Sequence, residues 1–153
     1  MKFHLLSIVL VLIFLSFAGF GQKIDYDKKT QFITIDGVNA FMMEKEGCGF
    51  ADANCYYNVS DTTGHRLFRV YYRDFKSSVE ISRANPQGIV RYIEFVFTET
   101  KQKAEVEFPG VKCEKIGKVI VKNQLIKDGK LDPKAVDDFV FTSGTPFSDR
   151  AQY

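Results

Sequence analysis

The standard catalytic motifs are missing from this 153-residue chain. It has no glycine-rich phosphate loop, no Gly-x-Ser-x-Gly nucleophile motif and no His-Glu-x-x-His zinc motif. Histidine is scarce, and beyond residue 21 only His65 is present. Because general acid–base and nucleophilic catalysis most often use histidine, the sequence offers little for an enzyme. We therefore expect a protein that is not an enzyme and holds no cofactor.

A strong net charge of either sign is also missing. The chain has 21 Lys and Arg against 19 Asp and Glu, and its basic residues are scattered between acidic ones. Proteins that bind nucleic acid through the phosphate backbone carry clustered positive charge. We therefore expect no nucleic-acid partner.

Long apolar runs are confined to the N-terminus. A weakly basic start is followed by an apolar run over residues 5–17, and Gly19 and Gly21 then precede Gln22. This order is typical of a secretory signal peptide, and the run is shorter than the roughly 20 residues that span a bilayer. We predict that residues 1–21 are cleaved and that the protein is periplasmic or secreted, with no membrane span afterwards. An uncleaved membrane anchor is the alternative.

Cysteine is limited to three residues, an odd number that permits at most one intramolecular bridge. Cys48 and Cys55 enclose six residues between two expected strands, and an oxidising compartment permits a disulfide there. We predict a Cys48–Cys55 bridge. Cys113 lies on an apolar helical stripe and is expected to be a buried, inert thiol. The alternative is a thiol enzyme or metal site that combines Cys113 with His65, although the spacing matches no standard zinc signature.

The first part of the chain predicts short strands separated by turns. Tryptophan is absent, whereas 15 Phe and 7 Tyr favour a sheet. Asp36-Gly37 indicates a two-residue hairpin turn, and residues 85–88, Asn-Pro-Gln-Gly, suit a type I turn. Alternation over residues 103–108 places Glu105 and Glu107 on a solvated face. The expected strands are 24–26, 31–35, 38–44, 55–59, 66–72, 78–84, 89–98 and 103–108.

The last part of the chain predicts two helices. Cys113, Ile116, Gly117 and Ile120 have helical spacing, and Asp132-Pro133 supplies an N-cap and a first-turn proline. The stripe of the second helix consists of Val136, Phe139 and Val140, and Gly144 is expected to end it. We predict one α+β domain over residues 22–153. It comprises an antiparallel sheet of about six to eight strands (22–108), a helical hairpin (110–144) packed on one face, and a tail (145–153).

Tyrosine and arginine alternate along one of the expected strands. Leu67, Arg69, Tyr71 and Arg73 share one face of that strand by their spacing. Tyr and Arg are enriched in interfaces, although such pairs also pack across ordinary sheets. We predict a non-enzymatic binding module whose partner is a protein, a glycan or an envelope component; a structural envelope-associated component is a further alternative. The candidate binding residues are Arg69, Tyr71, Arg73, Tyr57 and Tyr92.

Overall fold

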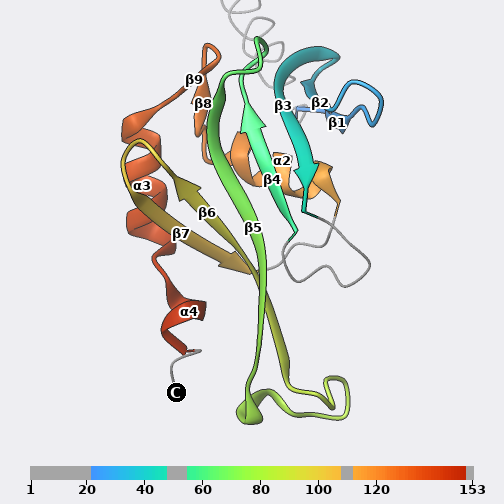
Figure 1. Ribbon diagram of the computed structural model, residues 1–153, viewed down its shortest axis with the longest axis vertical. Helices are drawn as coiled ribbons and strands as arrows, with labels where there is room; N and C mark the ends of the chain where they lie inside the picture. Colours follow the sequence, from blue (N-terminus) through green and yellow to red (C-terminus); the bar gives the residue numbers. More distant parts are fainter. Residues whose placement is uncertain (1–21, 48–54, 108–111, 151–153) are drawn as a thin grey trace, which may run out of the picture.

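The computed structural model describes residues 22–47, 55–107 and 112–150. Their centre is a seven-stranded antiparallel sheet in which every strand pairs with its neighbours in sequence (Figure 1). The helices that follow this sheet confirm the predicted α+β class. The predicted signal peptide lies outside the described residues. The strands are β1 (Ile24–Tyr26), β2 (Phe32–Ile35), β3 (Val38–Glu46), β4 (Tyr56–Ser60), β5 (Arg66–Lys76), β6 (Ile89–Phe97) and β7 (Gln102–Glu107).

The predicted turns close several of the hairpins. Asp36 and Gly37 have φ of 52° and 83°, and these positive values are those of the turn that matches the twist of a two-residue hairpin. In the turn before β6, the backbone N–H of Gly88 donates to the carbonyl of Asn85 at 3.0 Å, as a type I turn requires.

The expected strand over 78–84 is wrong. Residues Ser78–Glu80 form the 3-10 turn η1, and β5 instead runs through to Lys76. The reason is local hydrogen bonding: the N–H groups of Glu80 and Ser82 donate to the carbonyls of Ser77 and Asn85, both at 3.1 Å, and the side-chain amide of Asn85 donates to the carbonyl of Ile89 and accepts from its N–H, both at 3.1 Å. Such side-chain bonds to the backbone compete with the ladder of a strand.

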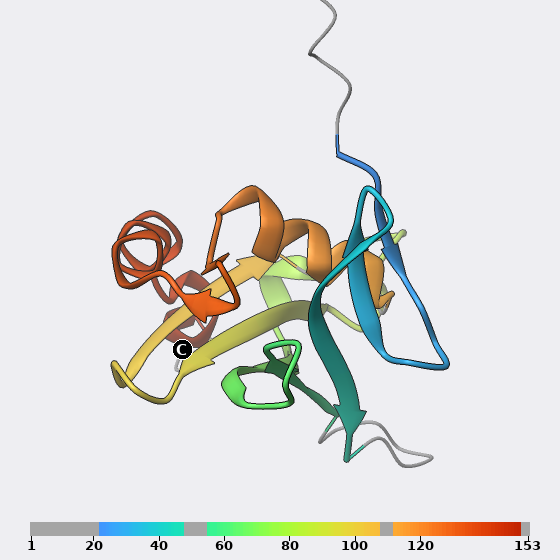
Figure 2. The same ribbon diagram turned by 90° about the horizontal axis from the view of Figure 1, so that it is seen from above.

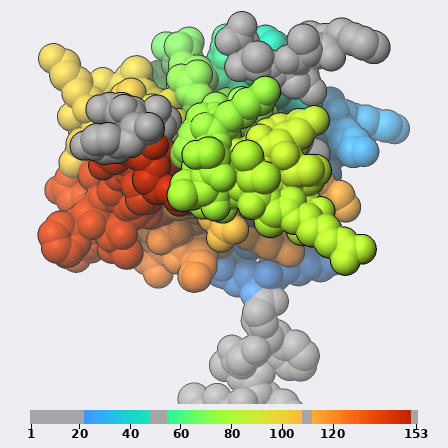
Figure 3. Space-filling model, turned by 90° about the horizontal axis from the view of Figure 1, so that it is seen from below, coloured from blue at the N-terminus to red at the C-terminus, as the bar shows by residue number. Residues whose placement is uncertain are grey.

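Strands β5 and β6 continue beyond their neighbours as a two-stranded projection, which we call the arm (residues 74–91). Their pairing extends to Lys76 and Ile89, whereas β4 stops pairing with β5 at Tyr71 and β7 stops pairing with β6 at Tyr92. The arm points away from the rest of the sheet in Figure 1. Figure 3 views the molecule from the end of the arm, with the red C-terminal segment beside it.

Two helices cover one face of the sheet (Figure 2). They are α2 (Cys113–Lys122) and α3 (Pro133–Ser143), joined through the small hairpin of β8 (Ile126–Lys127) and β9 (Lys130–Leu131). Ile116, Gly117 and Ile120 are buried, as their spacing predicted. A Cβ at Gly117 would lie 2.9 Å from Cδ1 of Ile33, so α2 lies very close to the sheet at this point.

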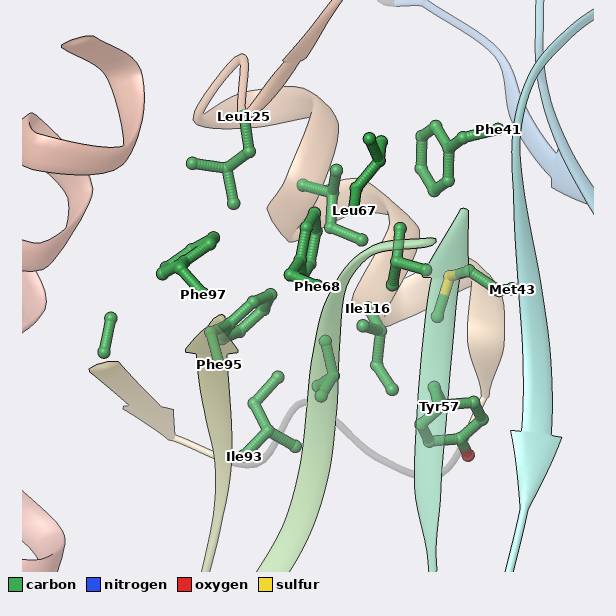
Figure 4. Packing of buried hydrophobic residues seen from close by; sticks show 14 of the residues in the cluster. Phe41, Met43, Tyr57, Leu67, Phe68, Ile93, Phe95, Phe97, Ile116 and Leu125 are labelled. Atoms are coloured by element: carbon green, nitrogen blue, oxygen red, sulfur yellow. The ribbon is translucent and has the colours of Figure 1, made fainter. Parts of the chain in front are cut away.

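The core lies between these helices and the sheet (Figure 4). Phenylalanine fills much of it: the ring of Phe139 on α3 meets the ring of Phe95 edge to face, with centroids 5.2 Å apart. The fully buried large side chains include Phe41, Phe68, Phe95, Phe97, Ile33, Met43, Ile93, Ile116, Ile120 and Leu125.

The predicted tail contains a short helix, α4 (Pro146–Arg150). Within the described ranges, no helix is long and apolar enough to cross a membrane.

Candidate binding surface on the open face of the sheet

The face of the sheet opposite α2 and α3 carries the tyrosines and arginines. Alternation along β5 directs Phe68 and Val70 into the core and Arg69, Tyr71 and Arg73 to the other side. We call this surface the Tyr/Arg face. Its residues are Tyr56 and Asn58 from β4, Arg69, Tyr71 and Arg73 from β5, Glu94 from β6 and Lys103 from β7.

Leu67 does not share this face with Arg69, contrary to the alternation that predicted it. The register of β4 against β5 shifts between Val59 and Ser60, and Leu67 turns into the core with 5% exposed surface. A bulge inserts one extra residue, so positions on either side of it change phase.

Arg69 lies across the ring of Tyr56. Its guanidinium carbon is 5.4 Å from the ring centroid, and its Nε donates to Oδ1 of the buried Asn58 at 3.1 Å. The ring of Tyr56 in turn lies 5.4 Å from that of Tyr71. The hydroxyl of Tyr56 donates to Glu46, and this bond raises the pKa of the tyrosine. Ring contacts and the Nε bond together hold Arg69 in one arrangement.

Arg73 repeats this arrangement on Tyr71. Its guanidinium carbon is 4.7 Å from the Tyr71 centroid, and its Nε donates to Oε2 of Glu94 at 3.0 Å. Nζ of Lys103 reaches the other oxygen of Glu94 at 3.0 Å. Because the Glu94 side chain is only 9% exposed, these ion pairs are less screened by solvent than ordinary surface pairs.

The arginines keep hydrogen-bonding capacity for a ligand. Arg69 and Arg73 each use Nε within the sheet, and across the described residues no hydrogen bond from their Nη atoms is found. The Nη groups supply the paired donors that bind carboxylates and phosphates. The Tyr/Arg face is therefore an ordered row of rings and guanidinium groups whose Nη donors are not used by any described residue.

Two of the five candidate binding residues lie elsewhere or are covered. Tyr57 points into the core with 3% exposed surface, among the side chains labelled in Figure 4, and Tyr56 takes its place on the Tyr/Arg face. Tyr92 does lie on that face but is only 7% exposed, because the ring of Phe147 stacks on it at 5.2 Å and 9°. Burial, with the negative charges of Glu105 and Glu94, raises the pKa of Tyr92.

Glu105 was expected on a solvated face, and this is wrong. Its surface is 2% exposed, and its Oε2 accepts the backbone N–H groups of Phe147 and Ser148, both at 2.9 Å. The C-terminal segment covers it. Sequence reasoning missed this contact because Phe147 and Ser148 lie 42 and 43 positions after Glu105, beyond the reach of any local pattern.

The alternative thiol or metal site gains little from the geometry. Cys113 is a half-buried free thiol, and burial raises its pKa, the opposite of what a nucleophilic cysteine needs. His65 is exposed in a turn, where its backbone N–H donates to the side chain of Asp61. A search of the described residues finds no group of three or more His, Cys, Asp or Glu that could hold a metal ion. Cys48 lies outside these residues, so the Cys48–Cys55 bridge stays a prediction.

Comparison with known proteins adds no further assignment: no protein family, no curated protein and no solved structure matches this chain.

Proposed function

We propose that this protein is an exported, non-enzymatic binding module that holds its partner on the Tyr/Arg face. One observation carries the proposal: Arg69 and Arg73 are fixed on Tyr56 and Tyr71 by ring contacts and Nε bonds, on the face that α2 and α3 leave open. The apolar run and small-residue exit of residues 1–21 support export.

The energetics of association favour such a surface. A flexible arginine loses roughly 0.5–1.5 kcal/mol of side-chain entropy when a partner immobilises it. Arg69 and Arg73 are already held within the sheet, so less of this loss remains for the binding step. Tyrosine and arginine also supply a large share of the residues that dominate measured interfaces. The partner is a protein, a glycan or an envelope component.

A paired substitution tests the proposal. We expect Arg69→Ala with Tyr71→Ala to weaken capture of the partner from a solubilised envelope fraction by about 30-fold, which corresponds to about 2 kcal/mol. Arg73 is left intact, because its loss would remove one of the two cations that pair with the buried Glu94 within the described part of the chain. Thermal denaturation of the double variant reports whether the fold is kept.

The matched control removes one cation and one aromatic ring from the helical side. Lys130 on β9 and Phe141 on α3 are both exposed, so Lys130→Ala with Phe141→Ala also removes one positive charge and one aromatic ring, away from the Tyr/Arg face. We expect this control to capture the partner normally. If the folded Arg69→Ala, Tyr71→Ala variant captured the partner as well as the unsubstituted protein does, the proposed surface would be disproved.

A further inference from the structure

The C-terminal segment passes from the helical side of the sheet to the Tyr/Arg face. We call residues 144–150 the strap. At its start, the carbonyl of Gly144 accepts the backbone N–H of Glu105 at 2.9 Å, so the chain turns around the outer edge of β7 there. Phe147 then stacks on Tyr92 on the opposite face from α3. The strap therefore lies over one end of the Tyr/Arg face.

The strap is attached by a few specific contacts. Glu105 accepts the N–H groups of Phe147 and Ser148, and Arg150 forms an ion pair with Glu80 on the arm. None of the five residues of α4 is buried, and so short a helix is not stable without docking. Figure 3 shows this segment beside the arm.

An open surface pocket lies between the strap and the arm. Its volume is about 400 Å³, and it is lined by Phe147 and Arg150 of the strap and by Val90, Arg91 and Glu107 of the sheet and arm. A segment without buried residues, held by separable polar contacts, opens at a lower free-energy cost than a core element.

The residues beneath the strap continue the Tyr/Arg face in register. Tyr92 is the cross-strand partner of Arg73, and Glu105 is the partner of Glu94. If the strap lifts, the face gains an aromatic ring and a carboxylate that accepts two N–H groups. In the strap, the ring of Phe147 contacts Tyr92, and two successive backbone N–H groups, those of Phe147 and Ser148, donate to Glu105.

We propose that Tyr92 and Glu105 form a subsite for a polypeptide segment that presents an aromatic side chain and two successive free backbone N–H groups, and that the strap occupies this subsite until the partner displaces it. The inference rests on the proposed function, because it extends the same face. It favours a polypeptide over a glycan, since the bound strap already shows the backbone N–H groups that Glu105 accepts. A short tether gives the strap a millimolar effective concentration, so a partner displaces it by also engaging Arg69 and Arg73.

The test uses the strap itself as the probe. A blocked peptide with the sequence of residues 143–150 is titrated into ¹⁵N-labelled protein carrying Phe147→Ala and Arg150→Ala, which removes the ring contact and the ion pair. We expect chemical-shift changes at Tyr92 and Glu105, and at least tenfold weaker binding to the unsubstituted protein, whose strap competes. The control peptide has alanine in place of phenylalanine and should bind at least tenfold more weakly.

Two results would overturn the inference. One is equal binding of the two peptides. The other is that the peptide causes no chemical-shift change at Tyr92 and Glu105, either in this variant or in a second variant truncated after Ser143. The amide spectrum of each variant shows whether it is folded. In the second case, a glycan that perturbs Tyr92 and Glu105 would replace the polypeptide assignment.

Failure here is distinguishable from failure of the proposed function. Adding Arg69→Ala and Tyr71→Ala to the peptide-binding variant should leave peptide affinity within about twofold, because the peptide contacts Tyr92 and Glu105 on β6 and β7, whereas Arg69 and Tyr71 lie on β5. Partner capture depends on Arg69 and Tyr71, whereas peptide binding depends on Tyr92 and Glu105.

Discussion

At Gly88 the backbone has φ of 60°, and a Cβ built there would lie 2.3 Å from the carbonyl oxygen of Ser77. That oxygen belongs to the backbone of the facing strand end and cannot move without distorting the arm. We expect Gly88→Ala to lower the free energy of unfolding by about 1–3 kcal/mol, because the methyl group adds a clash to a strained conformation. Urea denaturation of the two proteins measures the difference.

Gly64 provides the matched control for Gly88. Its φ is 88°, also in the left-handed region, but a Cβ there meets nothing within 4 Å. Gly64→Ala should therefore cost about 1–2 kcal/mol, from backbone strain alone, and less than Gly88→Ala, which adds the clash. Equal losses for the two substitutions would show that the contact with Ser77 has no effect.

The partly buried phenol of Tyr26 makes the stability of the fold depend on pH. Burial first, and then its interaction with Cys113, raises the pKa of Tyr26 from 10.0 to about 12. The folded protein holds this proton more tightly than the unfolded chain does, so the contribution to stability is complete below pH 10 and is lost as the pH rises towards 12. Tyr26→Phe should flatten the fall in unfolding free energy between pH 9 and pH 12. An unchanged slope would contradict the raised pKa.

Single residues show where sequence reasoning about side-chain direction reaches its limit. Tyr56 and Tyr57 are chemically identical neighbours, and only the phase of β4 decides which one is buried. Leu67 is placed by a bulge, and Glu105 by a segment about 40 residues later in the chain. Arg69, Tyr71 and Arg73 were placed on one face correctly because regular alternation on the C-terminal side of the bulge determines their direction.

Among the elements, both long helices were predictable because their signals are local. The Asp132 side chain accepts the N–H groups of Lys134 and Ala135 at 3.0 and 3.1 Å, and Pro133 begins α3. The arm was not predictable in the same way. Residues 78–84 have a strand-like composition, but the hydrogen bonds of Asn85 with Ile89 stabilise a compact tip instead.

The cap of α3 leads to a quantitative prediction. Asp132→Ala leaves two N–H groups at the start of the helix without their acceptor, and we expect a loss of about 1 kcal/mol in unfolding free energy. Asp138→Ala is the control on the same helix: it removes an exposed ion pair with Lys134, which solvent screens, so we expect a smaller loss there. The two losses are compared by thermal denaturation, and a cost at Asp132 no larger than that at Asp138 would contradict the capping role.

At the scale of the whole molecule, the two faces of the sheet are covered differently. One face is closed by α2 and α3 over an aromatic core, and among the described residues the strap is what covers part of the other. The order of strands followed by helices indicated the closed face from sequence. The short helix of the strap and its contact with Glu105 could not be predicted, because an isolated segment of five helical residues has no amphipathic period and gains its structure from Glu105 and Tyr92.

The environment in which the whole molecule folds is open to one direct measurement. We expect the exported protein to begin at Gln22 and, after alkylation under denaturing but non-reducing conditions, to carry one alkyl group, on Cys113. Denaturation is necessary because Cys113 is half-buried and burial raises its pKa, so the folded thiol reacts slowly. Intact-mass spectrometry reads the start of the chain and the number of alkyl groups together.

The number of alkyl groups tests the Cys48–Cys55 bridge, and the start of the chain tests cleavage after residue 21. Three alkyl groups would remove the predicted Cys48–Cys55 bridge but leave the Tyr/Arg face unaffected, because its geometry depends on β4 to β7. A mass that includes residues 1–21 would contradict cleavage and with it the predicted compartment. The uncleaved membrane anchor would then be the hypothesis to test, and the envelope fraction would be the place to search for a partner only if the chain sediments with membranes.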